Sequence, residues 1–263
     1  MTLTALAKEL DSLELTNSNE CKERVQFIIK LMMGIHWLHH PITAGTIISR
    51  CRRGFVSLEE DSFKCQSRDK IIDFQRASLP NDSVFYGAIG DMGTENGDYI
   101  AMLETSKLHR DGLRYGMEEL SVSHWVVKQD IDLAIICHPN VYMNVNPYGA
   151  VKEMQDNYTR RLIDYPNREL IPAFDKLVEF MSSQFAKKVN DGDNYQYMIS
   201  AFFAHYALET EAGIIYPSVQ SKGHLGFNIA LRPDIVEKYL VFKDAEHLIL
   251  ITEEDHIGYL RKE

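Results

Sequence analysis

The chain has 263 residues, with 38 acidic against 28 basic side chains and a formal net charge of −10 at pH 7. Because nucleic-acid phosphates are bound by clustered lysines and arginines, this balance argues against a direct nucleic-acid partner. No apolar run approaches the ~20 residues of a membrane-spanning helix, and the first residues lack the apolar core of a signal peptide. The four cysteines form no CxxC pair, which argues against a zinc ribbon and a thioredoxin motif. We therefore expect a cytoplasmic protein with reduced thiols.

The first forty residues predict two helices. Leucines recur at helical spacing over 4–14, and a second apolar stripe follows a capping residue at Ser18 or Asn19. The second helix is expected to run to about His39, with Pro41 ending it. Residues 1–42 are thus predicted to form an N-terminal helical extension.

The remaining chain predicts strands on both sides of a helical block. Short apolar or β-branched runs predict strands at 45–52, 83–89, 119–127, 131–137, 213–217, 226–232 and 245–252. Helical spacing marks 147–163, 167–189 and 194–208, and residues 93–112 predict a loop followed by a short helix. This order indicates an α+β fold with the helices gathered on one side. We expect one domain over 43–263 with a helical insert at about 140–194.

Two charged residues lie in apolar surroundings. Arg50 stands inside the strand at 45–52, where a charge without a partner is costly, so it is a candidate to bind an anion through its guanidinium. Alternation along a strand places Arg50 and Arg52 on one face. For Arg52 and Arg53 a solvated strand end is the simpler interpretation. Glu104 follows an apolar stretch and is either a buried carboxylate with a partner or an exposed residue at a helix end.

A tyrosine and a serine raise similar alternatives. Tyr86 lies in "VFYGA" and is either a core residue or a half-buried ring whose hydroxyl reaches a polar site. Ser218 lies in "YPSVQ", which lacks both glycines of the G-x-S-x-G nucleophile elbow. The sequence therefore argues against a nucleophilic serine. It leaves a serine at a strand end or a hydroxyl that positions substrate.

His36 and His40 are four residues apart, a spacing that puts two side chains on one face of a helix and that metal sites use. A zinc protease needs a glutamate directly after the first histidine, and Trp37 stands there. Histidines at a helix end also interact favourably with the helix dipole. A metal hydrolase is therefore our third hypothesis, and we assign no metal ligand.

Several of these stretches occur in an order that resembles a known family. An arginine on an early strand is followed by R-A-S-x-P-x-x-S-V-F-Y-G-A, then A-M-L-E, then G-I-x-Y-P-S-V. This order resembles the RES domain, named for its arginine, glutamate and serine, over residues 45–106 and 195–235. The matching residues are Arg50, Tyr86, Glu104 and Ser218, and Asn228 lies in "GFNIALRPD", which is similar to the continuation of the family.

The resemblance implies a mixed β core with surrounding helices, similar to ADP-ribosyltransferase toxins. It also implies a toxin that is neutralised by an Xre-type antitoxin protein. Members of the family consume NAD by hydrolysis or phosphorolysis, the latter with inorganic phosphate as co-substrate, or transfer its ADP-ribose to a protein. No other cofactor is expected. Since the chain lacks GxGxxG, Rossmann-type NAD binding is not expected.

The resemblance also implies roles for individual residues. Glu104 would stabilise an oxocarbenium-like transition state, as carboxylates do in glycoside cleavage. Arg50 would grip a phosphate group, and Arg76 would supply a second anion contact. Tyr86 would pack against nicotinamide or its ribose, and Ser218 would hydrogen-bond the substrate. Asn228 would bind the substrate beside them.

The sequence departs from the family at two points. Cys51 stands where small RES toxins often carry an aromatic residue, so one wall of the pocket differs. The N-terminal helices and the insert lengthen the chain, and they are expected to bind an antitoxin, to form a homo-oligomer or to gate the pocket. The alternative function is a non-catalytic nucleotide-binding or protein-interaction module on the same fold.

Overall fold

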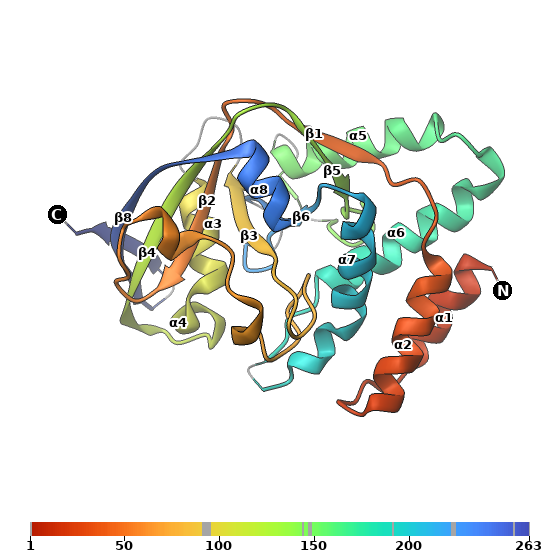
Figure 1. The fold of residues 1–263 in the computed structure, drawn as a ribbon, viewed down its shortest axis with the longest axis horizontal. Helices are drawn as coiled ribbons and strands as arrows, with labels where there is room; N and C mark the ends of the chain where they lie inside the picture. The colour runs from red at the N-terminus through yellow and green to blue at the C-terminus, as the bar shows by residue number, and fades with distance from the viewer. Residues whose placement is uncertain are drawn as a thin grey trace.

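One mixed β-sheet runs through the molecule, with helices packed against it (Figure 1). The computed structural model describes residues 2–90, 96–143, 145–146, 149–190, 192–221, 225–254 and 256–262. Within these ranges nine strands lie in the order β1-β5-β6-β7-β3-β2-β4-β8-β9, and the β5–β6 pair is parallel. The strands are β1 (His39–Ile42), β2 (Ile47–Arg53), β3 (Phe85–Gly90), β4 (Tyr115–Val127), β5 (Ile131–Ile135), β6 (Gly213–Pro217), β7 (Gly226–Leu231), β8 (Leu240–Glu253) and β9 (His256–Arg261). The α-helices are α1 (Leu3–Ser12), α2 (Asn19–Met32), α3 (Asn96–Thr105), α4 (Lys107–Arg110), α5 (Ala150–Ile163), α6 (Ile171–Phe185), α7 (Met198–Thr210) and α8 (Pro233–Tyr239).

Strands β1, β5, β6, β7 and β3 form the half of the sheet that we call the covered half. Every residue of β6 and β7 is buried, which fits their near-continuous apolar sequences "GIIYP" and "GFNIAL". On one face Ile214 packs into the largest hydrophobic core, with α1, α2, α6 and α7. On the other face Ile215 packs with Met154 of α5 and Val236 of α8. The helices therefore cover both faces of this half, rather than one side as predicted.

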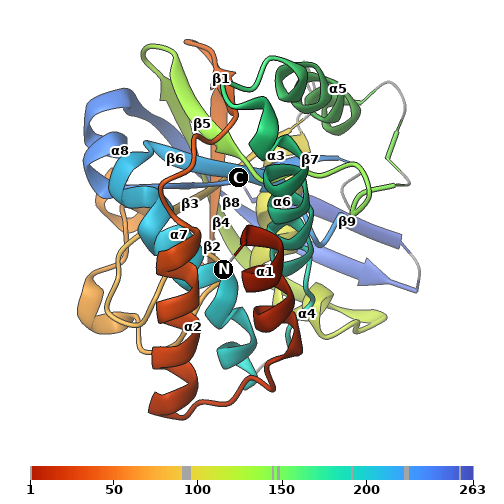
Figure 2. The same cartoon turned by 90° about the vertical axis from the view of Figure 1, so that its right-hand side faces the viewer.

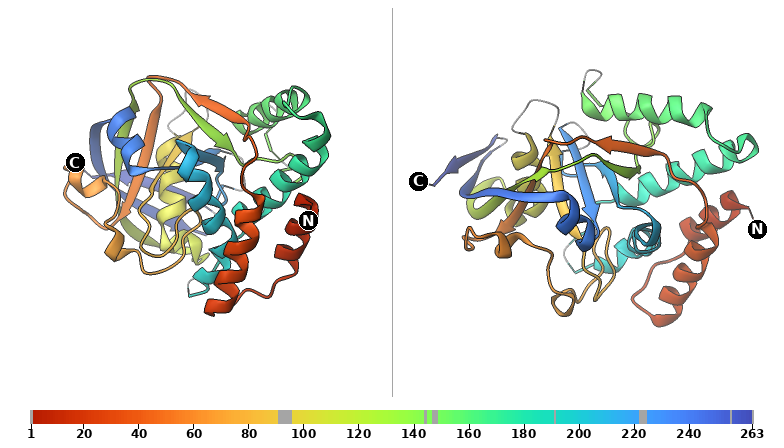
Figure 3. Two further views of the ribbon diagram at one scale, coloured as in Figure 1. Left: turned by 45° about the vertical axis from the view of Figure 1, so that its right-hand side comes forward. Right: turned by 45° about the horizontal axis from the view of Figure 1, so that its top comes forward.

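Strands β2, β4, β8 and β9 form the open half of the sheet. On β4, Leu120 and Val122 are buried and pack with Met102 of α3. On the opposite face, Tyr115 and Met117 expose 63% and 67% of their surface. At the start of β4 one face is therefore solvated, as is common in antiparallel sheets, whereas Ser121 and Ser123 further along the same face are buried. Figure 3 shows the C-terminal strands at the end of the molecule opposite the N-terminal helices.

The two halves meet between β2 and β3, where the pairing is interrupted. These strands are joined by one residue pair, Ser49 with Ala88, although β2 pairs with β4 and β3 with β7 along their lengths. Beyond this pair the Arg50 side chain bridges the two strands by donating to the Tyr86 carbonyl at 2.8 Å. The sheet is therefore parted at its centre.

The N-terminal helices differ in extent from the prediction. Ser18 caps α2 as predicted, since its hydroxyl accepts the Cys21 N–H at 3.2 Å. However, α2 ends at Met32 and not near His39, because Gly34 adopts a φ of +94°, the left-handed backbone that commonly ends helices. Figure 2 shows α1 and α2 lying against the other helices, and they share the largest core with α6 and α7.

The prediction that His36 and His40 share a helix face is wrong. His36 lies in the connection after α2, and His40 lies on β1, at the edge of the sheet. Pro41 stands inside β1, a position that proline tolerates in edge strands because a backbone donor is dispensable there.

The other predicted elements form near the expected places. Strands β1 and β9 and helix α8 were not predicted, although Pro233 at the start of α8 is a typical first helical residue. Residues 93–95 of the predicted loop, 147–148 of the predicted helix at 147–163, and Asp191 lie outside the described residues. Among the described helices none is both long and apolar enough to cross a membrane.

Candidate functional site

A cleft opens where the sheet is parted. Its inner pocket has a volume of about 170 Å³ and is lined by residues of both halves, among them Arg50, Tyr86, Glu104 and Asn228. An adjoining pocket of about 600 Å³ shares the last three of these residues and extends to Arg76. We call the two pockets together the central cleft. Arg50 and Asn228, which are 178 positions apart in sequence (228 − 50), thus meet where a ligand can enter.

Glu104 lies in the last turn of α3 and has two differently used oxygens. Its Oε1 atom accepts hydrogen bonds from the Ser218 hydroxyl at 2.7 Å, from Asn228 Nδ2 at 2.8 Å and from the Gln220 backbone N–H at 3.2 Å. Its Oε2 atom has no hydrogen bond to any described residue. Three donors on one oxygen fix the orientation of the carboxylate. The other oxygen is left for a ligand in the cleft.

Ser218 hydrogen-bonds the Glu104 carboxylate and does not line the cleft. The residue is fully buried, and its hydroxyl donates to Glu104 while accepting the Ser221 N–H at 3.3 Å. Within the described residues no imidazole hydrogen-bonds this hydroxyl, and its burial away from both pockets keeps it from reaching a substrate as a nucleophile. The structure therefore places Ser218 as a residue that positions Glu104. The hydroxyl faces Glu104 and not the cleft, and the predicted direct contact with substrate stays a prediction.

Arg50 brings a buried positive charge to the cleft. The residue is 4% exposed, and its guanidinium stacks on the Phe85 ring at 4.5 Å and donates to the carbonyls of Tyr86 and Lys64. Its Nε atom is buried without a hydrogen-bond partner, and no described carboxylate forms an ion pair with it. Burial, with Arg52 nearby, lowers the pKa of Arg50 to about 9, so the side chain stays charged at neutral pH. A buried cation without a counter-charge is suited to bind an anion.

Tyr86 contributes its ring to the cleft and directs its hydroxyl away from Glu104. The side chain is half-buried, and the hydroxyl accepts the Ala77 N–H at 3.0 Å and donates to Ser78 at 3.1 Å. Burial raises the pKa of Tyr86 to about 12. The tyrosine is therefore neutral, and it offers a ligand an apolar surface.

Arg76 lines the larger pocket, but its guanidinium is hydrogen-bonded to other residues of the protein. Its Nη1 atom donates to the carbonyls of Phe185 and Lys187 at the end of α6, and Nη2 donates to the Tyr197 hydroxyl at 3.3 Å. The side chain therefore satisfies carbonyls at a helix C-terminus, where a cation is favourable. These bonds compete with the second anion contact that the sequence suggested.

Arg52 is a cleft residue that the sequence interpretation missed. It was expected at a solvated strand end, but it is half-buried and lines the inner pocket. The prediction that Arg50 and Arg52 share a face is confirmed, because both donate to the Lys64 carbonyl. Their spacing of two residues was the available signal. Cys51 between them is turned toward α3, and burial raises the pKa of its thiol to about 12, so it is no nucleophile at neutral pH.

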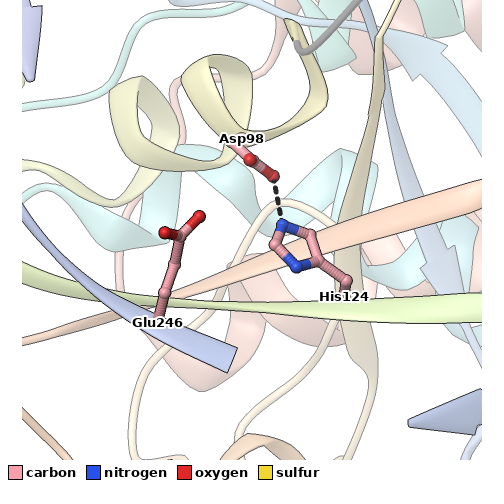
Figure 4. Close-up of side chains that lie close together, drawn as sticks. All are labelled: Asp98, His124 and Glu246. Atoms are coloured by element: carbon pink, nitrogen blue, oxygen red, sulfur yellow. Dashed lines mark hydrogen bonds and ion pairs between the residues drawn. The ribbon is translucent and has the colours of Figure 1, made fainter. Parts of the chain in front are cut away.

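A second cluster of ionisable residues lies on the open half (Figure 4). His124 is hydrogen-bonded through Nε2 to Asp98 at 2.9 Å and through Nδ1 to Asp244, and Glu246 pairs with Arg261. The hydrogen bond with Asp98, helped by Asp244, raises the pKa of His124 to about 9. Both ring nitrogens then carry protons, which leaves no lone pair for a metal ion. The cluster ties α3 to β4 and β8.

His138 and Asp175 resemble part of a hydrolase triad without its geometry. Nε2 of His138 pairs with Asp175 at 3.1 Å, and Nδ1 accepts the Asn140 N–H at 3.2 Å. Ser182 meets the backbone N–H of His138 and not its ring. With both ring nitrogens engaged, this histidine has no free lone pair to activate a nucleophile.

Comparison with known proteins does not indicate a function, so the function is inferred from the residues of the central cleft. No protein-family model and no curated protein matches the chain.

Proposed function

We propose that the protein cleaves the bond between nicotinamide and ribose in NAD, on a RES-type fold similar to ADP-ribosyltransferases. The observation that carries this proposal is the Glu104 carboxylate, fixed by three donors on Oε1 and with no described donor to Oε2. The same cleft holds the buried Arg50, which pairs with no described carboxylate. A sheet parted at the cleft, with one wall from each half, supports the fold proposal.

The chemistry suits a lone carboxylate. The bond between C1′ and the pyridinium nitrogen breaks with its electron pair going to nitrogen, so neutral nicotinamide leaves without a general acid. The ribose becomes oxocarbenium-like, and a fixed carboxylate stabilises this charge and accepts a hydrogen bond from a ribose hydroxyl. The acceptor, which is water, phosphate or a protein side chain, then bonds to C1′ and releases a proton.

The remaining cleft residues fit the parts of NAD. The larger pocket, at about 600 Å³, lies within the ~300–1,000 Å³ that ligand sites usually span. The Tyr86 ring supplies an apolar surface for nicotinamide or its ribose, and Arg50 supplies charge for a phosphate. In the cytoplasm such an activity depletes NAD, so as a RES-type toxin the protein would need a neutralising Xre-type antitoxin.

The proposal is tested by incubating purified protein with NAD and following free nicotinamide, with and without inorganic phosphate. We expect release, and we expect Glu104→Gln to slow it about a hundredfold or more, because a fixed charge is lost from the transition state. Glu119→Gln, which neutralises an exposed carboxylate outside the cleft, is the matched control and keeps the wild-type rate. Thermal unfolding checks that both variants fold.

Each outcome decides between the functions considered. A phosphate requirement identifies a phosphorylase, and release without phosphate identifies a hydrolase. Absence of release in both conditions, together with absence of ADP-ribosylated protein in a lysate, overturns the proposal. Tight NAD binding without turnover would instead establish the non-catalytic nucleotide-binding module.

A further inference from the structure

Two arginines on one face of β2 converge on a single carbonyl at the inner pocket. We propose that Arg50 and Arg52 together bind one doubly charged phosphate or diphosphate group at this wall of the cleft. The identification of that group with the diphosphate of NAD rests on the proposed function, whereas the anion site itself does not.

The backbone of the segment before η2 (Arg68–Lys70) holds both guanidiniums in place. The Lys64 carbonyl accepts from Arg50 Nη2 at 3.3 Å and from Arg52 Nη2 at 2.8 Å, and the Ser62 carbonyl accepts from Arg52 Nε at 3.3 Å. Carbonyls orient an arginine without neutralising it. The pair is therefore preorganised, and a ligand does not have to order two long side chains on binding.

Among the residues that the structure describes, the two charges lack a counter-charge, although the protein has an excess of carboxylates. Within the described residues neither Arg50 nor Arg52 forms an ion pair, whereas Arg53 pairs with Glu118 at 3.0 Å and Arg232 with Asp234 at 2.7 Å. Arg50 also keeps a buried Nε–H without an acceptor. The buried Arg50 and the half-buried Arg52 repel each other, and a dianion between them removes this repulsion and supplies the missing acceptor.

The positions of the two arginines and of Glu104 indicate how a nucleotide would be oriented in the pocket. Both arginines and Glu104 line the same pocket of about 170 Å³, but no ion pair joins them. Because a phosphate is repelled by a carboxylate, the anion belongs at the β2 wall, and the uncharged ribose belongs toward Glu104. The remainder of a nucleotide extends into the larger pocket, which shares Glu104 and Gln66 with the inner one.

The test is calorimetric binding of inorganic pyrophosphate and of ADP-ribose at one fixed salt concentration. Arg52→Gln is expected to weaken both about tenfold or more, since it removes a charged hydrogen-bonding partner. Arg68→Gln makes the same charge change on the exposed η2 turn outside the cleft and should bind within about twofold of wild type. Arg52→Lys keeps the charge without the planar fork and should lie between the two. It also serves as the informative variant if Arg52→Gln does not fold.

Equal pyrophosphate affinity in wild type and the Arg52 variants overturns the anion site, even if the protein consumes NAD. Binding that depends on Arg52 supports the site, even if nicotinamide is never released, and in that case the proposed function fails alone. An orthophosphate arm separates the sources of the anion. If orthophosphate binds as tightly as pyrophosphate, the site takes one dianionic group, and tighter pyrophosphate binding supports a diphosphate.

Discussion

Polar side chains in the covered half and in the open half of the sheet have different hydrogen-bond partners. In β6 and β7 every residue is buried, so any polar side chain there needs an internal partner. Asn228 on β7 and Ser218 just after β6 both find it in Glu104. In β2 and β4 polar side chains find their partners on other elements: Arg50 donates to the Tyr86 carbonyl on β3, and His124 is hydrogen-bonded to Asp98 on α3.

This difference explains why the cleft has two unlike walls. The covered half supplies a rigid wall on which one carboxylate is fixed, and the open half supplies two arginines held by loop carbonyls. Rigid packing suits a group that must face a transition state in one orientation. A pair of arginines without an ion-pair partner among the described residues suits the binding of an anion. The halves would therefore divide catalysis and binding between them.

The largest difference between the halves should appear in their packing. Phe203 on α7 is 1% exposed and lies 4.9 Å from the Trp37 ring beneath the covered half. Phe203→Ala is expected to lower the free energy of unfolding by about 3–5 kcal/mol, because it removes buried apolar surface and leaves a cavity. Urea unfolding measures this change. A loss below about 1 kcal/mol would contradict a tightly packed helical layer.

The second difference concerns how Glu104 is held. Ser218→Ala removes one of three donors to Oε1, and we expect nicotinamide release to fall about tenfold to a hundredfold in kcat, with KM nearly unchanged. Ser221→Ala removes a hydroxyl that bonds the Ser218 carbonyl and not Glu104, so it is the control. If KM rises while kcat stays constant, Ser218 contacts substrate, as the sequence suggested.

The central strands of the covered half were easier to predict from the sequence than the strands at the two edges of the sheet. The predicted strands at 213–217 and 226–232 are nearly continuous apolar runs and match β6 and β7 almost to the residue, whereas the edge strands β1 and β9 were not predicted. The end of α2 was misplaced because Pro41 was weighted above Gly34, which is the residue with the left-handed backbone.

The sequence predicted which residues belong to the site but not how their side chains contact one another. The order of motifs identified Arg50, Tyr86, Glu104 and Ser218, but no local pattern shows that Ser218 faces a carboxylate 114 positions away. Arg52 was set aside because exposure was judged from its place at a strand end. Long-range contacts decide both roles, and a single sequence does not contain them.

A smaller effect is expected in the ion-pair cluster of the open half. His124 has its pKa raised from 6.5 to about 9 by Asp98 and Asp244. Its contribution to stability is therefore full below pH 6.5 and is lost as the pH rises to about 9. Since Asp244 is half exposed, we expect His124→Gln to lower the free energy of unfolding by only about 1–2 kcal/mol at pH 6. The difference from wild type should narrow by pH 9.5, and a pH-independent difference in urea unfolding would contradict this assignment.

The smallest effect is expected on the solvated face of β4. Met117 is 67% exposed, so Met117→Thr should change the free energy of unfolding by less than about 0.5 kcal/mol. Thermal and urea unfolding at two protein concentrations measure it. A loss of about 2 kcal/mol or more that grows with protein concentration would show that a second copy of the chain covers this face, because only association makes stability depend on concentration. The open half would then be an interface, and its contrast with the covered half would hold for the monomer alone.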